Sequence, residues 1–191
     1  MKSVLISIRP KWVEKIANGQ KTIEVRKSAP KEVPFKAYIY CSKEKKQDDI
    51  IWAGAFGDRG KWNGHVIGEF ICDKVFLLRP YSYDGGNADL ERRKFIETFE
   101  RPSKNIEILS ATCLSQDEMF DYIGEGNYGY GWQISDLKIY DKPKELSDFC
   151  ISCKTNCEDC KKPIFYDCWK EKGKIKVVTR PPQSWQYVEE I

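Results

Sequence analysis

The chain has 191 residues, of which 41% are hydrophobic and 32% are charged, and it contains six Trp, ten Tyr and nine Phe. This composition suits one folded domain with a small appendage and excludes a disordered chain. The net charge of +3 is too small to identify a nucleic-acid-binding protein, and the single histidine, His65, excludes most histidine-based catalytic or metal sites. The sequence has neither an apolar run of membrane-spanning length nor the features of a signal peptide, so we expect a cytoplasmic protein without membrane contact.

The first quarter of the chain is its most basic part, with twelve basic and six acidic residues among residues 1–50. It opens with Ser3–Ile8, a β-branched and apolar run that predicts a strand. Pro10 suits the first turn of a helix, and Gly19 is a helix-ending residue. Apolar residues repeat at helical spacing between them, at Trp12, Val13, Ile16 and Ala17. We therefore predict a strand, a short helix and a tight turn.

The next stretch, KTIEVRK at residues 21–27, alternates as a half-buried strand does, with Glu24 and Arg26 on its polar side. The turn at Gly19 brings Lys21 to the start of this strand. Charged side chains at this spacing can bind an anion or the polar edge of a base. From the spacing alone, however, a solvated edge strand protected by its charges is the favoured interpretation.

The remaining elements give an α+β pattern without a regular alternation of strand and helix. Ser115 and Glu118 form a capping box that opens a helix, and Gly124 closes it. A polar, glycine-rich loop is expected over 42–64 and a helix over 87–100. The expected strands lie at 34–41, 65–78, 106–114, 130–141 and, late in the chain, within 174–190. This pattern predicts a curved sheet or a small barrel.

The segment IRPKWVEKIANGQKTIEVRK resembles the opening of the activating signal cointegrator homology (ASCH) family. The signature of that family is Gly-x-Lys-x-x-Glu-x-Arg, which is matched by Gly19, Lys21, Glu24 and Arg26. The resemblance continues through an aromatic strand around Trp132 and covers the chain up to about residue 140. The ending RPPQSWQYVE is similar to that of small phage or prophage members of the family.

The resemblance implies a PUA-like small β-barrel with short peripheral helices and a cleft lined by the signature residues. We accordingly expect an ASCH barrel over residues 1–147 that binds RNA or a modified nucleotide. A Cys-rich C-terminal appendage is expected at 148–170, and residues 171–191 are expected to pack back on the barrel with one or two late strands.

The resemblance implies a ligand site made of Lys21, Glu24 and Arg26. Arg9, Trp52 and Trp62 are further ligand candidates. An unpaired base would stack on an aromatic ring while charged side chains read its polar edge and lysines hold the backbone. Trp52 and Trp62 fall in the glycine-rich loop and are candidates for a lid. Trp12 and Trp132 occupy apolar periodic positions and are expected in the core, and Tyr130 is a further aromatic candidate.

The same resemblance leaves an enzymatic function open. Some small relatives are amidohydrolases that deacetylate acetylcytidine with the lysine equivalent to Lys21, and others have been described as ribonucleases. An enzyme of this kind would be a hydrolase acting on a modified nucleoside or RNA, with Lys21 as nucleophile or base and Glu24 as proton shuttle. Glu24 stands where those amidohydrolases have a threonine, and this departure favours binding over catalysis.

Five of the eight cysteines lie in a C-x2-C-x3-C-x2-C motif or shortly after it. Two C-x2-C pairs without a nearby histidine predict a closed structural zinc site with four thiolate ligands. The expected ligands are Cys150, Cys153, Cys157 and Cys160, with Cys168 able to replace one of them. The pairs are closer together than in a typical zinc ribbon, so an iron–sulfur cluster and unligated thiols stay open. The three isolated cysteines are expected to be buried hydrophobes, namely Cys41, Cys72 and Cys113.

Three functions therefore compete. The favoured one is a nucleic-acid-binding module that uses the signature cleft. The second is a hydrolase that uses the same cleft, and the third is a zinc-stapled adaptor that recruits a protein partner through its Cys-rich segment.

Overall fold

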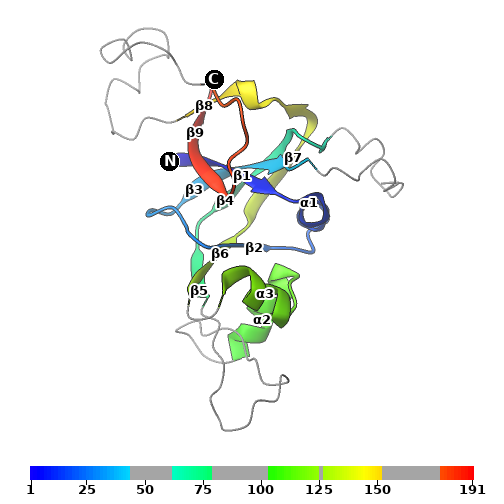
Figure 1. Ribbon diagram of the computed structural model, residues 1–191, viewed down its shortest axis with the longest axis vertical. Coiled ribbons are helices and arrows are strands. Elements are labelled where there is room, and N and C mark those ends of the chain that lie inside the picture. The colour runs from blue at the N-terminus through cyan, green and yellow to red at the C-terminus, as the bar shows by residue number, and fades with distance from the viewer. Residues whose placement is uncertain (44–61, 79–102, 125–126, 152–176) are drawn as a thin grey trace. The chain divides into compact units, whose positions relative to one another are not determined.

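The computed structural model describes residues 1–43, 62–78, 103–124, 127–151 and 177–191 (Figure 1). Its elements, in chain order, are β1 (Lys2–Ile8), α1 (Pro10–Ala17), β2 (Ile23–Arg26), β3 (Phe35–Cys41), β4 (Val66–Cys72), β5 (Val75–Leu78), α2 (Ser103–Thr112), α3 (Gln116–Ile123), β6 (Gly129–Gln133), β7 (Ser135–Lys144), η3 (Leu146–Asp148), β8 (Phe149–Ile151) and β9 (Trp185–Glu190). The predicted strand at 3–8 and helix after Pro10 are both confirmed. None of the described helices is long and apolar enough to cross a membrane.

The chain divides into two compact units. Unit 1 comprises Met1–Val13, Lys36–Phe70 and Lys138–Ile191. Unit 2 comprises Glu14–Phe35 and Ile71–Leu137. The signature residues therefore all belong to unit 2.

The strands form two sheets, one with the order β7-β4-β3-β1-β9-β8 and one with the order β2-β6-β5. In the larger sheet β9 lies antiparallel to both of its neighbours, with Val4 of β1 opposite Tyr187 and Phe149 of β8 opposite Glu190 (Figure 1). The edges of this sheet, β7 and β8, do not pair with each other in the described part of the chain. The α+β class is correct, but the expected closed barrel is wrong, because these sheets are open.

Two of the expected strands are each divided between the sheets. The run 65–78 breaks at Asp73 and Lys74, so that β4 joins the larger sheet and β5 the smaller one. The run 130–141 breaks at Ile134 in the same way and yields β6 and β7. Asp136, just inside β7, has a φ of 49°, which is uncommon for a residue other than glycine.

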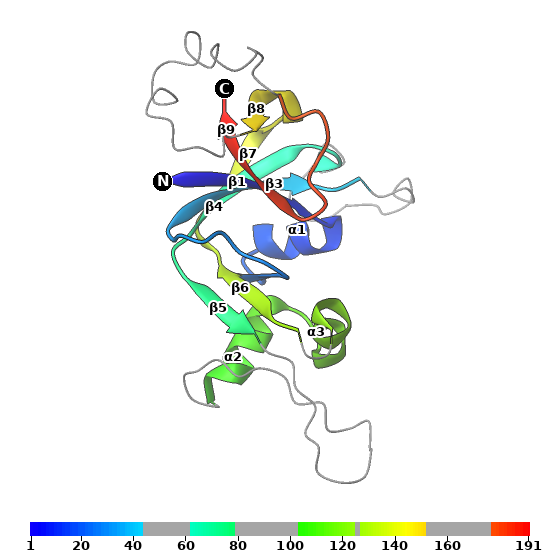
Figure 2. The same cartoon turned by 60° about the vertical axis from the view of Figure 1, so that its left-hand side comes forward.

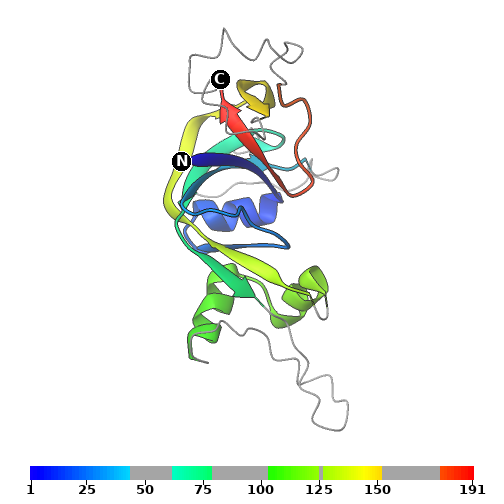
Figure 3. The ribbon, with the colours of Figure 1, turned by 90° about the vertical axis from the view of Figure 1, so that its left-hand side faces the viewer.

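The smaller sheet carries its apolar core on one face. Helices α2 and α3 lie beside it (Figures 2 and 3), and α2 contacts β2. The core of this face consists of Ile23, Val25, Leu78, Ile108, Met119 and Ile123. The predicted capping box of α3 is confirmed, with the Ser115 hydroxyl accepting from the Glu118 backbone at 3.1 Å and Glu118 accepting from the Ser115 backbone at 2.9 Å.

The strand expected at 106–114 is wrong, because most of this segment belongs to helix α2. Ile108 is 7% exposed and packs in the core of unit 2, so tertiary packing overrides the strand propensity of the β-branched run. The helix expected at 87–100 and most of the loop expected at 42–64 lie outside the described residues.

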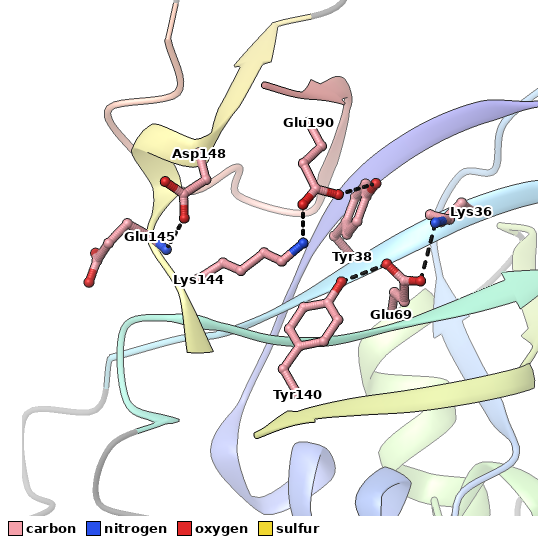
Figure 4. Close-up of polar contacts among 8 residues, drawn as sticks. All are labelled: Lys36, Tyr38, Glu69, Tyr140, Lys144, Glu145, Asp148 and Glu190. Atoms are coloured by element: carbon pink, nitrogen blue, oxygen red, sulfur yellow. Dashed lines mark hydrogen bonds and ion pairs between the residues drawn. The ribbon is translucent and has the colours of Figure 1, made fainter. Parts of the chain in front are cut away.

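Unit 1 contains a polar cluster of two tyrosines, two glutamates and two lysines on its sheet (Figure 4). In one half of this cluster, the Tyr140 hydroxyl donates to Glu69 at 2.6 Å and the Lys36 ammonium donates to the other carboxylate oxygen at 3.1 Å. In the other half, the Tyr38 hydroxyl donates to Glu190 at 3.0 Å, and Lys144 pairs with the same carboxylate. The charges balance, and the contacts connect strands β3, β4, β7 and β9, so the cluster serves the stability of unit 1.

This polar cluster predicts a loss of stability at both extremes of pH. Burial and the bond to Glu69 raise the pKa of Tyr140, so the stability it contributes is complete below its ordinary pKa of 10.0 and is lost as the pH rises above that value. Burial also raises the pKa of Glu69, but the bonds from Tyr140 and Lys36 outweigh it and lower that pKa overall. The stability that Glu69 contributes is complete above its ordinary pKa of 4.5 and is lost as the pH falls through its lowered value.

Tyr140→Phe should therefore lower the free energy of unfolding by about 1 kcal/mol at neutral pH and flatten both limbs of the pH profile. The measurement is the urea midpoint across the pH range. Tyr187→Phe, at a partly buried tyrosine of β9, is the control and should keep the wild-type profile. A Tyr140→Phe profile parallel to that of the wild type would contradict the assignment.

Candidate functional site

The signature residues are positioned by the end of α1 and the start of β2. Gly19 has a φ of 71°, which lets the chain turn at once after the helix. The backbone N–H groups of Gln20 and Lys21 both donate to the carbonyl of Lys15, at 2.9 and 3.0 Å. Thr22 then anchors the strand, because its N–H donates to Ala111 and its carbonyl accepts from Ile134. The charged residues consequently leave this turn in a fixed backbone.

All three charged signature side chains are buried. Lys21 is 2% exposed, Glu24 3% and Arg26 8%. The solvated edge strand favoured from spacing alone is therefore wrong. The alternating pattern correctly predicted a strand, but the side chains on both faces of β2 are buried rather than those on one face.

The three side chains form one ion-paired triad. The Lys21 ammonium lies 3.3 Å from one oxygen of Glu24, and the Arg26 guanidinium lies 3.0 Å from the other. The triad thus consists of two cations that share one carboxylate. Burying such charges is costly unless they are paired, so each member depends on the others.

Lys21 has a second partner in helix α2. Its ammonium donates to the carbonyl of Thr112 at 2.6 Å, and Thr112 is the last residue of that helix. A cation at this end is favoured by the helix dipole and satisfies one of the last carbonyls. The sequence does not reveal this partner, because the β-branched run that includes Thr112 predicts a strand.

The triad shares its sheet face with two aromatic residues of β6. Glu24 lies opposite Trp132 and Arg26 opposite Tyr130 in the β2–β6 ladder, and directly opposed residues point to the same face. Trp132 is fully buried, as predicted, and the ring of Phe35 meets it edge-on at 5.0 Å. Tyr130 is partly exposed, so the Arg26 end is the more accessible end of this face.

Comparison with known proteins identifies the fold. No protein-family model matches the sequence, and no curated protein matches it either. The crystal structure of the ASCH protein from Zymomonas mobilis is similar, with a TM-score of 0.53 and 15% identity over 98% of this chain and 88% of that one. A Tyr→Phe variant of that protein gives a TM-score of 0.52 at 15% identity, over 99% of this chain and 91% of its own. A Ser→Ala variant gives 0.51 at 15% identity, over 98% and 89%.

The chain has the ASCH fold. The resemblance inferred from the signature is thus confirmed at the level of the fold, over nearly the whole chain. At 15% identity this likeness shows the fold alone. The phage or prophage origin stays a prediction.

The other predicted ligand residues are not members of the triad. Arg9 and Trp62 belong to unit 1. Arg9 is exposed, whereas Trp62 is partly buried and its carbonyl accepts from the N–H of His65 at 3.1 Å. Trp12 is only partly buried rather than in the core, with the Lys11 ammonium 4.2 Å from its ring centroid. Trp52 lies outside the described residues.

Most of the predicted zinc site also falls outside the described residues, namely Cys153, Cys157, Cys160 and Cys168. Cys150 is buried in β8, where it lies opposite Glu189 of β9. Its backbone also forms an isolated antiparallel β-bridge with Val177. The described ranges contain no group of three or more His, Cys, Asp or Glu residues arranged to hold a metal. The structural zinc therefore stays a prediction.

The isolated cysteines partly follow expectation. Cys41 and Cys72 are buried, and burial raises the pKa of the Cys72 thiol to about 12, which keeps it protonated and unreactive. Cys113 is only partly buried, and its thiol donates to the carbonyl of Gln20 at 3.2 Å.

Proposed function

We propose that the chain binds RNA or a modified nucleotide at the face of the smaller sheet that carries the triad. The observation behind this proposal is the triad itself, in which two buried cations pair with one carboxylate. A protein that needed only stability would gain as much from an apolar cluster at such a position. Paired cations beside a partly exposed aromatic ring suit an anionic, aromatic ligand.

The three members have different roles in this proposal. Arg26, the least buried of the three and the neighbour of Tyr130, contacts the ligand. Glu24 holds the Arg26 guanidinium in one orientation, which lowers the entropy lost on binding. Lys21 neutralises Glu24 from the other side and ties β2 to the end of α2.

The same geometry favours binding over a hydrolase. An amine attacks a substrate through its lone pair, and a lysine that serves as nucleophile must also reach the substrate. The Lys21 ammonium donates to Thr112, pairs with Glu24 and is almost inaccessible to solvent. The hydrolase and the zinc-stapled adaptor stay as alternatives. No observation on the described residues favours either of them.

The binding proposal predicts that Arg26→Gln weakens binding of a short single-stranded RNA about tenfold at low salt, because a charge-assisted contact is lost. Fluorescence anisotropy of a labelled oligonucleotide is the measurement, with the urea midpoint checking that the variant is folded. Arg180→Gln, at an exposed arginine of unit 1, is the matched control and should retain most of the affinity. Equal losses in both variants would indicate nonspecific attraction, and absence of wild-type binding would refute the proposal.

A further inference from the structure

Two rows of side chains cross the smaller sheet on the face that carries the triad. Each row takes one residue from β2, one from β6 and one from β5. The inner row consists of Glu24, Trp132 and Val75. The outer row consists of Arg26, Tyr130 and Leu77. Directly opposed residues of an antiparallel ladder point to the same face, so each row is a continuous line of side chains.

The opposite face of this sheet is the one that packs on the helices. Ile23 and Leu78, which alternate with members of the two rows, belong to the core shared with α2 and α3. On this face β6 has glycines. A Cβ atom on Gly131 would lie 2.9 Å from the Ile23 side chain, and one on Gly129 would overlap Ile123. Strand β6 therefore carries both of its aromatic side chains on the triad face.

The two rows differ in their exposure. Trp132 is fully buried and its ring meets Phe35 edge-on at 5.0 Å, so no ligand can stack on it. Tyr130 and Leu77 are partly exposed, and Arg26 is the least buried member of the triad. The outer row thus presents one aromatic ring between a cation and an aliphatic side chain.

The outer row suits the parts of one nucleotide. Neighbouring strands lie about 5 Å apart, so the row extends about 10 Å from β2 to β5. Arg26 at one end can bind a phosphate through charge-assisted hydrogen bonds. Tyr130 in the middle can stack a base, because aromatic side chains on the face of a sheet are platforms for unpaired bases. Leu77 at the other end offers apolar contact to the edge of that base.

Two other occupants match the outer row less well. An apolar protein segment would cover the Arg26 guanidinium without supplying an anion, which is unfavourable for a charged group. A run of stacked bases needs several aromatic rings, and the row has only Tyr130. A single base with its phosphate uses every member of the row.

We propose that the outer row is a subsite for one unpaired nucleotide of an RNA, with the base on Tyr130 beside Leu77 and the phosphate on Arg26. This inference rests on the proposed function and deepens it. It assigns the base and the phosphate of the ligand to different strands and limits the subsite to one base.

The test compares labelled ribose-phosphate strands of equal length that carry no base, one adenine or adenine throughout. By fluorescence anisotropy, the wild type should bind the single-adenine strand about tenfold more tightly than the abasic one. The all-adenine strand should gain only the few-fold expected from its larger number of equivalent bases. Arg26→Gln should weaken binding of all three strands, because it removes the phosphate contact.

Tyr130→Leu should abolish the preference for the single-adenine strand, whereas Tyr130→Phe, which keeps the ring, should retain it. Tyr122→Leu is the matched control. It makes the same substitution at a partly buried tyrosine that packs against the helix-covered core of unit 2, and it should keep the preference. The urea midpoint shows whether each variant is folded, and the comparison of strands with the wild type does not depend on any variant.

The outcomes separate this inference from the proposed function. Equal affinity of the wild type for the abasic and single-adenine strands, or an undiminished preference in folded Tyr130→Leu, would overturn the subsite and leave the triad as a phosphate-binding RNA site. A further tenfold gain with each added base would overturn the limit to one nucleotide. Loss of the preference in Tyr122→Leu would refute the assignment to the triad face. Binding of no strand by the wild type would overturn both proposals.

Discussion

Glu24→Gln should lower the free energy of unfolding by about 3 kcal/mol or more, because it leaves two buried cations without their shared anion. Glu24 accepts Lys21 on one oxygen and Arg26 on the other, and all three side chains are almost fully buried. Glutamine keeps the shape of the side chain but removes its charge, so the effect isolates electrostatics from packing. Urea unfolding followed by circular dichroism measures the loss.

Glu107→Gln is the matched control for this variant. Glu107 is an exposed glutamate of α2 in the same unit, and its replacement should change stability by no more than about 0.5 kcal/mol. A loss below about 1 kcal/mol for Glu24→Gln would mean that water reaches the triad and that Lys21 and Arg26 do not depend on Glu24. The roles proposed for the three residues in binding would then fail as well.

The elements that the sequence predicted correctly are those that local chemistry specifies. Helix α1 begins at a proline and ends before a glycine with positive φ, and α3 has a capping box that closes on itself within four residues. These signals require no partner elsewhere in the chain. They appear in the sequence as clearly as in the structure.

The elements that were wrong depend on partners distant in sequence. Helix α2 packs Ile108 on β2, and its last carbonyl accepts Lys21, which precedes it by 91 residues. A β-branched run of this length fits a strand or a buried helix equally well, and only these contacts decide between the two. The division of 65–78 and 130–141 between two sheets is likewise invisible to alternation, because both halves of each run are good strands.

The surroundings of the signature residues were likewise not predictable from local sequence. Alternation in β2 correctly separated Glu24 and Arg26 from the apolar residues, but it could not tell whether their side meets water or protein. The expectation of a site at these residues came from the ASCH resemblance. Their burial as an ion-paired group is the physical reason to expect one. Two further ligand candidates, Arg9 and Trp62, belong to unit 1, and their role in binding stays a prediction.

Trp132→Ala should lower the free energy of unfolding by about 3 to 5 kcal/mol, because it opens a large cavity beside Phe35 and under Glu24. Trp132 is fully buried, its ring meets Phe35 edge-on at 5.0 Å, and it lies opposite Glu24 in the ladder. Trp12→Ala is the control. Trp12 was expected in the core on the same grounds but is only partly buried, so its loss should cost about 1 kcal/mol. Far-ultraviolet circular dichroism in urea suits both variants, since it does not depend on tryptophan emission.

The comparison of these two tryptophan variants also tests how the site is supported. If Trp132 holds the β2–β6 face in place, RNA binding by Trp132→Ala should fall even where the variant is fully folded. The reason is that Glu24 loses the side chain opposite it, and Glu24 is the residue that orients Arg26. Trp12→Ala should bind RNA as the wild type does. Similar losses of stability in the two variants would contradict the burial of Trp132, whereas a Trp132→Ala variant that is destabilised but binds normally would separate the core of unit 2 from its ligand site.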